Sequence, residues 1–272
     1  MTFVAHVPRP PLSDFVELLW HYDGYDPGHP RERLLPTGTN ELVFDLDDAP
    51  MLVSARDDGP FEKYRGPILC GVHAEPFAID TSKPATVLGV HFKPGGVFPF
   101  LPVSAAEVQG RHVPLEDLWG ARARAIREQV LNTPTVAGKF AALERGLLSL
   151  VRRPLERHPA VAFALDRFVG GSRVGGVGKV ADQSGLCRRQ FIETFRREVG
   201  LTPKLFCRVR RFQDVLAYVE GQRRVAWAAV AQACGYFDQA HFIRDFRAFS
   251  GLNPSAFLSV RTEHRNHLPL SA

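Results

Sequence analysis

Residues 191–206 read FIETFRREVGLTPKLF, and residues 242–257 read FIRDFRAFSGLNPSAF. The second stretch begins 51 positions after the first and repeats phenylalanine, phenylalanine, glycine, leucine, proline and phenylalanine at the same spacing. Recurrence at a fixed period is the signature of a supersecondary unit that occurs more than once. A tandem repeat therefore decides the fold of the C-terminal half.

The repeat extends upstream into a short apolar helix and a tight turn. Val180-Ala181 and Ser184-Gly185-Leu186 correspond, at an offset of 50, to Val230-Ala231 and Cys234-Gly235-Tyr236. Glycine suits the turn because it adopts backbone angles that a Cβ resists. Helix, turn and second helix predict a helix-turn-helix unit, whose second helix can enter the major groove of DNA.

The second helix of each copy has an apolar stripe, from Phe191 to Val199 and from Phe242 to Phe249, that is expected to face the core. Scattered arginines usually lie on a solvated face, but here they occupy repeat-equivalent positions on helices assigned to DNA. The outward side chains suit bases and phosphates. These candidate DNA-binding residues are Arg188, Arg189, Ile192, Glu193 and Arg196 in the first copy and Gln239, Ala240, Ile243, Arg244 and Arg247 in the second.

The segments GYFDQAHFIRDFR at 235–247 and GLNPSAF at 251–257 resemble the signature of the AraC/XylS transcriptional regulators. The resemblance covers roughly the last hundred residues and implies two helix-turn-helix units joined by a linker helix, with a β-rich, cupin-like sensor domain before them. It also implies a bacterial-type regulator that binds specific DNA sequences. Glu193 departs from the basic or amide residue often found at its position, so it either accepts from a cytosine amine or holds Arg189.

The linker helix is predicted from Leu201 to Gly221, with Thr202-Pro203 as its N-cap and first turn. About 20 residues of helix span about 30 Å, which separates two recognition helices by roughly one turn of DNA. Its expected core stripe is Phe206, Val209, Phe212, Leu216 and Val219. Among its basic side chains, those that face either phosphates or solvent are Lys204, Arg208 and Arg211.

Charge and proline divide the chain of 272 residues into two halves. Residues 158–261 hold 16 Lys and Arg against 8 Asp and Glu, whereas residues 1–157 hold 17 against 20. A basic surplus attracts nucleic acid by displacing counterions from phosphates. We expect a β-rich sensor or dimerisation domain with trailing helices at 1–157, the DNA-binding domain at 158–261, and a tail at 262–272.

The first half carries 17 of the 21 prolines, which favours short strands and loops. A strand-turn-strand is predicted at 33–46, and 12–22 is either a short helix or a first strand. Further strands are expected at 68–73, 77–80 and 86–92. The predicted fold class is α+β: a β-rich domain shaped as a cupin-like barrel or sandwich, with flanking helices, followed by an all-α domain.

Helices are expected after residue 103. Ser104 and Glu107 form a capping box, and Pro114 begins the next helix in its first turn. Two amphipathic helices at 121–151, interrupted at 132–134, either pack on the β domain or form a dimer seam. The C-terminal half begins with a helix at 161–169, and the glycines at 170–178 weaken the start of the next one.

No catalytic motif, phosphate loop or dinucleotide fingerprint is present, and neither a cofactor nor a metal is expected. His73, Glu75 and His91 lie near strand ends and would form a two-histidine, one-carboxylate metal site only if they converged. The four cysteines have no zinc-ligand spacing and suit a cytoplasmic protein with reduced thiols. Neither a signal peptide nor a membrane-spanning run is apparent.

Three functions remain open at this point. The favoured one is a sequence-specific, non-enzymatic transcription regulator whose N-terminal domain responds to a small-molecule effector. The alternatives are a cupin-like metal-dependent enzyme fused to a DNA-binding module, and a ligand-independent DNA binder. The expected partners are double-stranded DNA at two adjacent major-groove segments, a small-molecule effector, a second copy of the chain and, for an activator, RNA polymerase; no membrane is expected.

Overall fold

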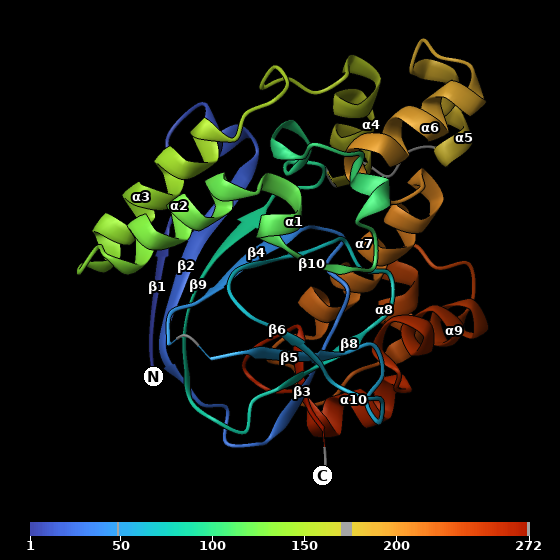
Figure 1. Ribbon diagram of the computed structural model, residues 1–272. Coiled ribbons are helices and arrows are strands. Elements are labelled where there is room, and N and C mark those ends of the chain that lie inside the picture. Colours follow the sequence, from blue (N-terminus) through green and yellow to red (C-terminus); the bar gives the residue numbers. More distant parts are fainter. Residues whose placement is uncertain (48, 170–175, 271–272) are drawn as a thin grey trace.

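The computed structural model describes residues 1–47, 49–169 and 176–270. Strands dominate its first half and helices its second (Figure 1). The strands of the first half are β1 (Thr2–His6), β2 (Val16–Tyr25), β3 (Arg31–Leu34), β4 (Glu41–Asp45), β5 (Met51–Ser54), β6 (Glu62–Tyr64), β7 (Ile68–Cys70), β8 (Phe77–Asp80), β9 (Ala85–Phe92) and β10 (His112–Pro114).

Within the described residues these strands form two antiparallel sheets. One has six strands in the order β1-β2-β9-β4-β7-β10. The other has five in the order β11-β3-β8-β5-β6, where β11 (His267–Pro269) comes from the C-terminal half. The predicted β-rich domain is therefore confirmed. The turn at 36–40 carries the chain from one sheet to the other, so the predicted strand-turn-strand is present but is not a hairpin.

Helices cover one face of the six-stranded sheet (Figure 1). They are α1 (Leu115–Trp119), α2 (Ala121–Leu131) and α3 (Val136–Ser149). Their buried residues share one hydrophobic cluster with β2, β4, β7 and β9. The two predicted amphipathic helices thus pack on the β domain, because their apolar stripes complete its core.

The C-terminal half contains the two predicted helix-turn-helix units. Its helices are α4 (Pro159–Val169), α5 (Val177–Gln183), α6 (Arg188–Val199), α7 (Pro203–Val219), α8 (Trp227–Ala233), α9 (Gln239–Ser250) and α10 (Pro254–Val260). Helices α5 and α6 form the first unit, α8 and α9 the second, and α7 joins them. We predicted that the glycines at 170–178 weaken the start of the helix that follows them. Most of these positions, 170–175, lie outside the described residues.

Local chemistry explains why the helices end and restart where they do. Gly200 and Gly251 end α6 and α9 in the left-handed conformation, with φ of 90° and 73°. The Thr202 hydroxyl then accepts from Leu205 N, and the Asn253 side chain from Ala256 N, at the next N-caps. The repeated glycine-leucine-x-proline therefore encodes a helix stop and a helix start.

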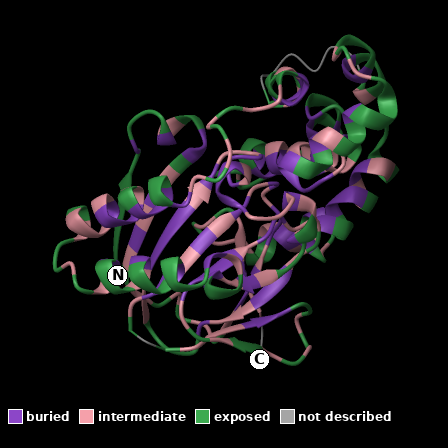
Figure 2. Cartoon of the chain, turned by 45° about the horizontal axis from the view of Figure 1, so that its top comes forward, coloured by how far each residue is buried: buried purple, intermediate pink, exposed green. Residues whose placement is uncertain are grey.

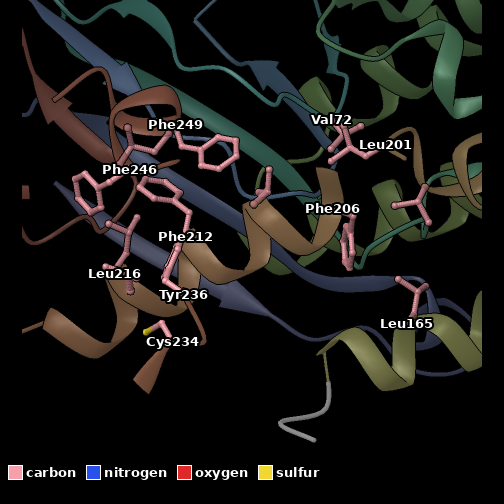
Figure 3. Close-up of a cluster of buried hydrophobic side chains, with 14 of the residues drawn as sticks. Val72, Leu165, Leu201, Phe206, Phe212, Leu216, Cys234, Tyr236, Phe246 and Phe249 are labelled. Atoms are coloured by element: carbon pink, nitrogen blue, oxygen red, sulfur yellow. The ribbon is translucent and has the colours of Figure 1, made fainter. Parts of the chain in front are cut away.

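The phenylalanines of both copies are buried as predicted. Phe206, Phe212, Phe246 and Phe249 belong to one hydrophobic cluster (Figure 3), whereas exposed residues gather on the outer sides of the helices (Figure 2). The predicted stripe of α7 is also buried along its whole length.

The same cluster includes Leu35, Val72 and Leu268, so the β-rich half contributes to the core of the helical half. A Cβ at Gly38 would lie 3.4 Å from Val209 Cγ1 of α7. Gln213 of α7 donates to Pro36 O at 2.8 Å. Close contacts of this kind hold the two halves together.

The end of the chain returns to the first half. After α10, residues His267–Pro269 form β11, which pairs antiparallel with β3. The side chain of Leu268 is buried in the shared cluster. Residues 267–269 are therefore a strand of the five-stranded sheet.

Several elements differ from the predictions. Residues 12–22, for which a short helix or a strand was expected, contain both: 12–14 form a 3-10 turn, and 16–22 belong to β2. Pro114 is the N-cap of α1 and not part of its first turn. The strands β1, β5, β6, β10 and β11 were not expected, because they are three to five residues long and lack clear alternation. No helix in the described ranges is long and apolar enough to cross a membrane.

Candidate nucleic-acid interface

Helix α6 presents its polar face at the surface, beginning directly after the Gly185 turn. Arg188 donates from Nε and Nη2 to the two carboxylate oxygens of Asp182 on α5, at 3.0 and 3.1 Å. The hydrogen bonds from Arg188 lower the pKa of Asp182. Both side chains are exposed, so this guanidinium can exchange the carboxylate for a phosphate without leaving water.

Arg189 and Glu193 form a second exposed pair, four residues apart on α6. Arg189 Nε lies 3.2 Å from Glu193 Oε1, and the side chains are 87% and 64% exposed. Of the two roles considered for Glu193, this geometry matches the holding of Arg189. Ile192, which is 42% exposed, and Arg196 complete the face, so all the candidate residues of the first copy reach solvent.

Helix α9 presents the equivalent face in the second copy. Asp238 caps it by accepting from His241 N at 2.6 Å. Gln239, Ala240, Arg244 and Arg247 are exposed. Ile243 is the exception, because it is partly buried and packs on the hydrophobic cluster. The side chain of Ile243 therefore faces outward only in part, in contrast to the prediction.

A buried carboxylate ties α9 to the linker helix. Asp245 accepts from Arg208 Nη2 of α7 at 2.8 Å, and it lies 3.6 Å from His241 Nε2. Arg211 of α7 contacts Gly235 O at 3.4 Å and stacks over the ring of Tyr236. Of the linker side chains considered for phosphate contacts, Arg208 and Arg211 thus hold the second unit together, and Lys204 is exposed.

Sequence reasoning missed several exposed residues beside these helices. Phe237, in the turn before α9, is 91% exposed. Lys179 on α5, and Arg223 and Arg224 before α8, are also exposed. The signal for the arginines was a consecutive basic pair in a turn that precedes a helix, a position suited to phosphate contacts.

The three residues considered for a metal site do not converge. His91 Nδ1 lies 2.5 Å from Glu41 Oε1, and its Nε2 lies 3.3 Å from Thr39 Oγ1. Burial opposes ionisation of Glu41, but the hydrogen bond with His91 and the charges of His91 and His267 together outweigh it and lower the pKa of the carboxyl. The ring of His73 lies instead against those of His112 and Phe77, tilted by 34° and 38°. Across 1–47, 49–169 and 176–270, no group of three His, Cys, Asp or Glu side chains is arranged to hold a metal.

Two family models match separate parts of the chain, one in the β-rich half and one in the helical half. Residues 180–259 match the model of a helix-turn-helix domain. The C-terminal part of the chain is therefore similar to helix-turn-helix domains. Residues 4–114 match a domain of unknown function, DUF6597.

Individual relatives are distant. An uncharacterized helix-turn-helix-type transcriptional regulator of Haemophilus influenzae is 28% identical over 81 residues, which are 30% of this chain and 27% of that protein. The chain thus matches about a quarter of the length of this curated relative.

Solved structures with some likeness include ToxT from Vibrio cholerae, at 10% identity and a TM-score of 0.45, covering 95% of this chain and 98% of that one. A fatty-acid-bound ToxT has 8% identity, 94% coverage of both chains and a TM-score of 0.47.

Proposed function

We propose that this protein is a sequence-specific transcription regulator of the AraC type. Residues 158–261 bind double-stranded DNA, and the β-rich half binds a small-molecule effector. The observation that carries the proposal is the repeated helix-turn-helix unit, in which α6 and α9 each turn a polar, exposed face to solvent while their phenylalanines are buried. Two such faces on one chain suit two adjacent segments of the major groove.

The residues divide by chemistry into base readers and phosphate contacts. Arg189 on α6, and Gln239 and Arg244 on α9, offer the donors and acceptors that read base edges, and Glu193 holds Arg189 in position. Arg196 and Arg247, in the last turns of their helices, suit phosphates, which position a protein but carry no direct sequence information.

The contacts between the halves give an effector a physical route to the DNA-binding helices. Arg33 of β3 donates to Ser250 O at the end of α9, at 2.9 Å, and forms an ion pair with Asp57. At the end of α6, Ser104 Oγ contacts Arg197 O at 3.4 Å. A change in the β-rich half therefore bears on the C-terminal ends of both recognition helices. A second copy of the chain and, for an activator, RNA polymerase complete the proposed partners.

The test is the salt dependence of DNA binding by the full chain. A duplex is first selected from a random pool, and its affinity is measured by fluorescence anisotropy at several salt concentrations. The logarithm of the binding constant should fall linearly with that of salt, with a slope of about −0.9 per phosphate contacted. Salt-independent binding, or no binding to any duplex in the pool, would exclude the proposed function.

A further inference from the structure

A cavity of about 490 Å³ lies between one edge strand of each sheet, β6 and β10. Strand β6 closes it from the five-stranded sheet, β10 from the six-stranded sheet, and the connection between β7 and β8 completes the wall. This volume is within the range of about 300–1,000 Å³ that is usual for small-molecule sites.

Aromatic rings form one wall of the cavity. The ring centroids of His73, Phe77 and His112 lie 4.5 to 4.7 Å apart in every pair. The ring of Tyr64 adds to this wall at 6.0 Å from His112. Such a group of rings offers contact to another flat ring, which prefers offset or edge-to-face stacking at these distances.

Two nitrogen atoms in this wall lack a hydrogen-bond partner. Nε2 of His73 and Nε2 of His112 are buried, and neither has a partner among the described residues. Burial lowers the pKa of His73 to about 3 and that of His112 to about 4, so both imidazoles are neutral at physiological pH. A neutral imidazole donates or accepts at Nε2 according to its tautomer. Unpaired buried polar atoms cost free energy, and a ligand that pairs them recovers it.

We propose that this cavity binds an uncharged, flat aromatic molecule with a hydrogen-bonding edge. Its ring lies against His73, Phe77 and His112, and a small turn of either imidazole brings its buried, unpartnered Nε2 to the polar edge of the ligand. The identification of this molecule as the effector rests on the proposed function, whereas the binding itself does not.

The charges around the cavity argue against an ionic ligand. The two histidines supply no cation, and Arg111 at the wall is offset by Glu62 and Glu75. Desolvating a charged ligand beside neutral imidazoles would cost more than these exposed groups return. A metal is disfavoured as well, since no third ligand joins the two histidines within the described part of the chain.

The cavity is connected to the DNA-binding half through the two chain neighbours of His73. Val72, directly before His73, is fully buried in the cluster that contains Leu201 (Figure 3). Ala74, directly after His73, also packs on this cluster. A Cβ at Gly200 would lie 2.5 Å from Val72 Cγ1, so the end of α6 follows any shift of this connection. Occupation of the cavity therefore has a direct mechanical path to the first recognition helix.

The experiment uses the full chain labelled with ¹⁵N at histidine and four matched probes. Phenol and benzamide are flat and neutral with a polar edge; cyclohexanol keeps the hydroxyl but is not flat, and benzoate is flat but charged. We expect phenol or benzamide to bind and to shift the Nε2 resonances of His73 and His112. Cyclohexanol and benzoate should bind at least about tenfold more weakly.

Two variants distinguish the contribution of the Nε2 atoms to binding from that of the flat rings. His73→Phe and His112→Phe keep a flat ring but remove Nε2, and each should weaken binding by about tenfold or more. His6→Phe is the control, because His6 lies on β1 against Phe140 and outside the cavity. Unfolding curves of all three variants identify any loss that comes from misfolding.

Binding of neither aromatic probe, tighter binding of benzoate, or a Zn²⁺-dependent shift of both histidines without aromatic binding would overturn the proposal. Duplex binding is measured on the same samples. Salt-dependent DNA binding without aromatic binding refutes the cavity proposal alone. Aromatic binding without any DNA binding refutes the proposed function and leaves the cavity as a binding site of another kind.

Discussion

In the free protein the guanidinium of Arg189 pairs with Glu193. In the proposed complex with DNA it contacts a base instead. The exposed ion pair contributes little to stability, since such pairs are typically worth about 0–1 kcal/mol. Arg189→Ala should therefore leave the free energy of unfolding nearly unchanged. It should cost about 1–3 kcal/mol of binding on the selected duplex and relax the preference at one base pair.

Arg124→Ala is the matched control, because Arg124 forms a similarly exposed pair with Glu116, at 2.7 Å, between α2 and α1. It should change neither affinity nor preference. Anisotropy with the selected duplex and its single-base variants measures both effects. An equal loss on every duplex would make Arg189 a phosphate contact and not a base reader.

A comparison of alanine substitutions at Gly200 and Gly221 distinguishes the cost of backbone strain from the cost of steric overlap. Both have positive φ, at 90° and 73°, where an alanine costs roughly 1–2 kcal/mol. A Cβ at Gly221 meets nothing within 4 Å, whereas one at Gly200 would lie 2.5 Å from Val72 and 3.1 Å from Ala105 O. We expect Gly221→Ala to lower the free energy of unfolding by the cost of strain alone. Gly200→Ala should lower it by about 1–3 kcal/mol more, because of the overlap with Val72 and Ala105. Urea unfolding compares them, and equal costs would show that the halves do not press together at α6.

At the scale of elements, α7 sets the distance between the two recognition helices. It has 17 residues, which corresponds to about 26 Å of helix, somewhat shorter than the 30 Å expected from the sequence. The pairing of Arg208 with Asp245 fixes its position against α9. The second unit is thus locked to the linker by a buried carboxylate as well as by phenylalanines.

This geometry predicts a footprint of two segments about ten base pairs apart on one face of the duplex. Bending DNA to meet both helices would cost on the order of 1–6 kcal/mol. Hydroxyl-radical footprinting of the full chain tests it with two double variants. Arg188→Ala with Arg189→Ala should erase one segment, and Gln239→Ala with Arg244→Ala the other. If one pair removes both segments and the other removes none, only one unit engages DNA and its companion is scaffolding.

At the scale of the molecule, β11 makes the end of the chain part of the first half. Leu268 is 1% exposed and packs in the cluster shared with the C-terminal helices. Leu268→Ala should therefore destabilise the protein by about 2–5 kcal/mol. Leu148→Ala on α3, where the side chain is 43% exposed, is the control and should stay within about 0.5 kcal/mol.

The tryptophans report on both halves in this experiment. Trp20 and Trp119 lie in the β-rich half, and Trp227 in the helical half. Single-tryptophan versions should show coincident unfolding transitions, because the two halves share a core. A stability unaffected by Leu268→Ala, or two separate transitions, would mean that the halves fold independently.

The sequence alone determined the elements that depend on near neighbours. The phenylalanine stripes, the glycine stops and the caps at Thr202 and Asn253 are set by residues within one or two helical turns, so their spacing predicted both helix-turn-helix units and the linker. The strands at 41–45 and 85–92 were found for the same reason, since runs of β-branched and aromatic residues specify a strand locally.

Only the tertiary structure decided which distant groups meet. On sequence alone, His73 and His91 were considered as ligands of one metal site. In the structure the ring of His73 lies against that of His112, and His91 forms a hydrogen bond with Glu41. β11 joins β3 across more than half of the chain. No local period encodes such partners, because they follow from how two sheets and a helical domain bury their apolar faces together. The cavity beside His73 and its path to α6 therefore became visible only in the folded molecule.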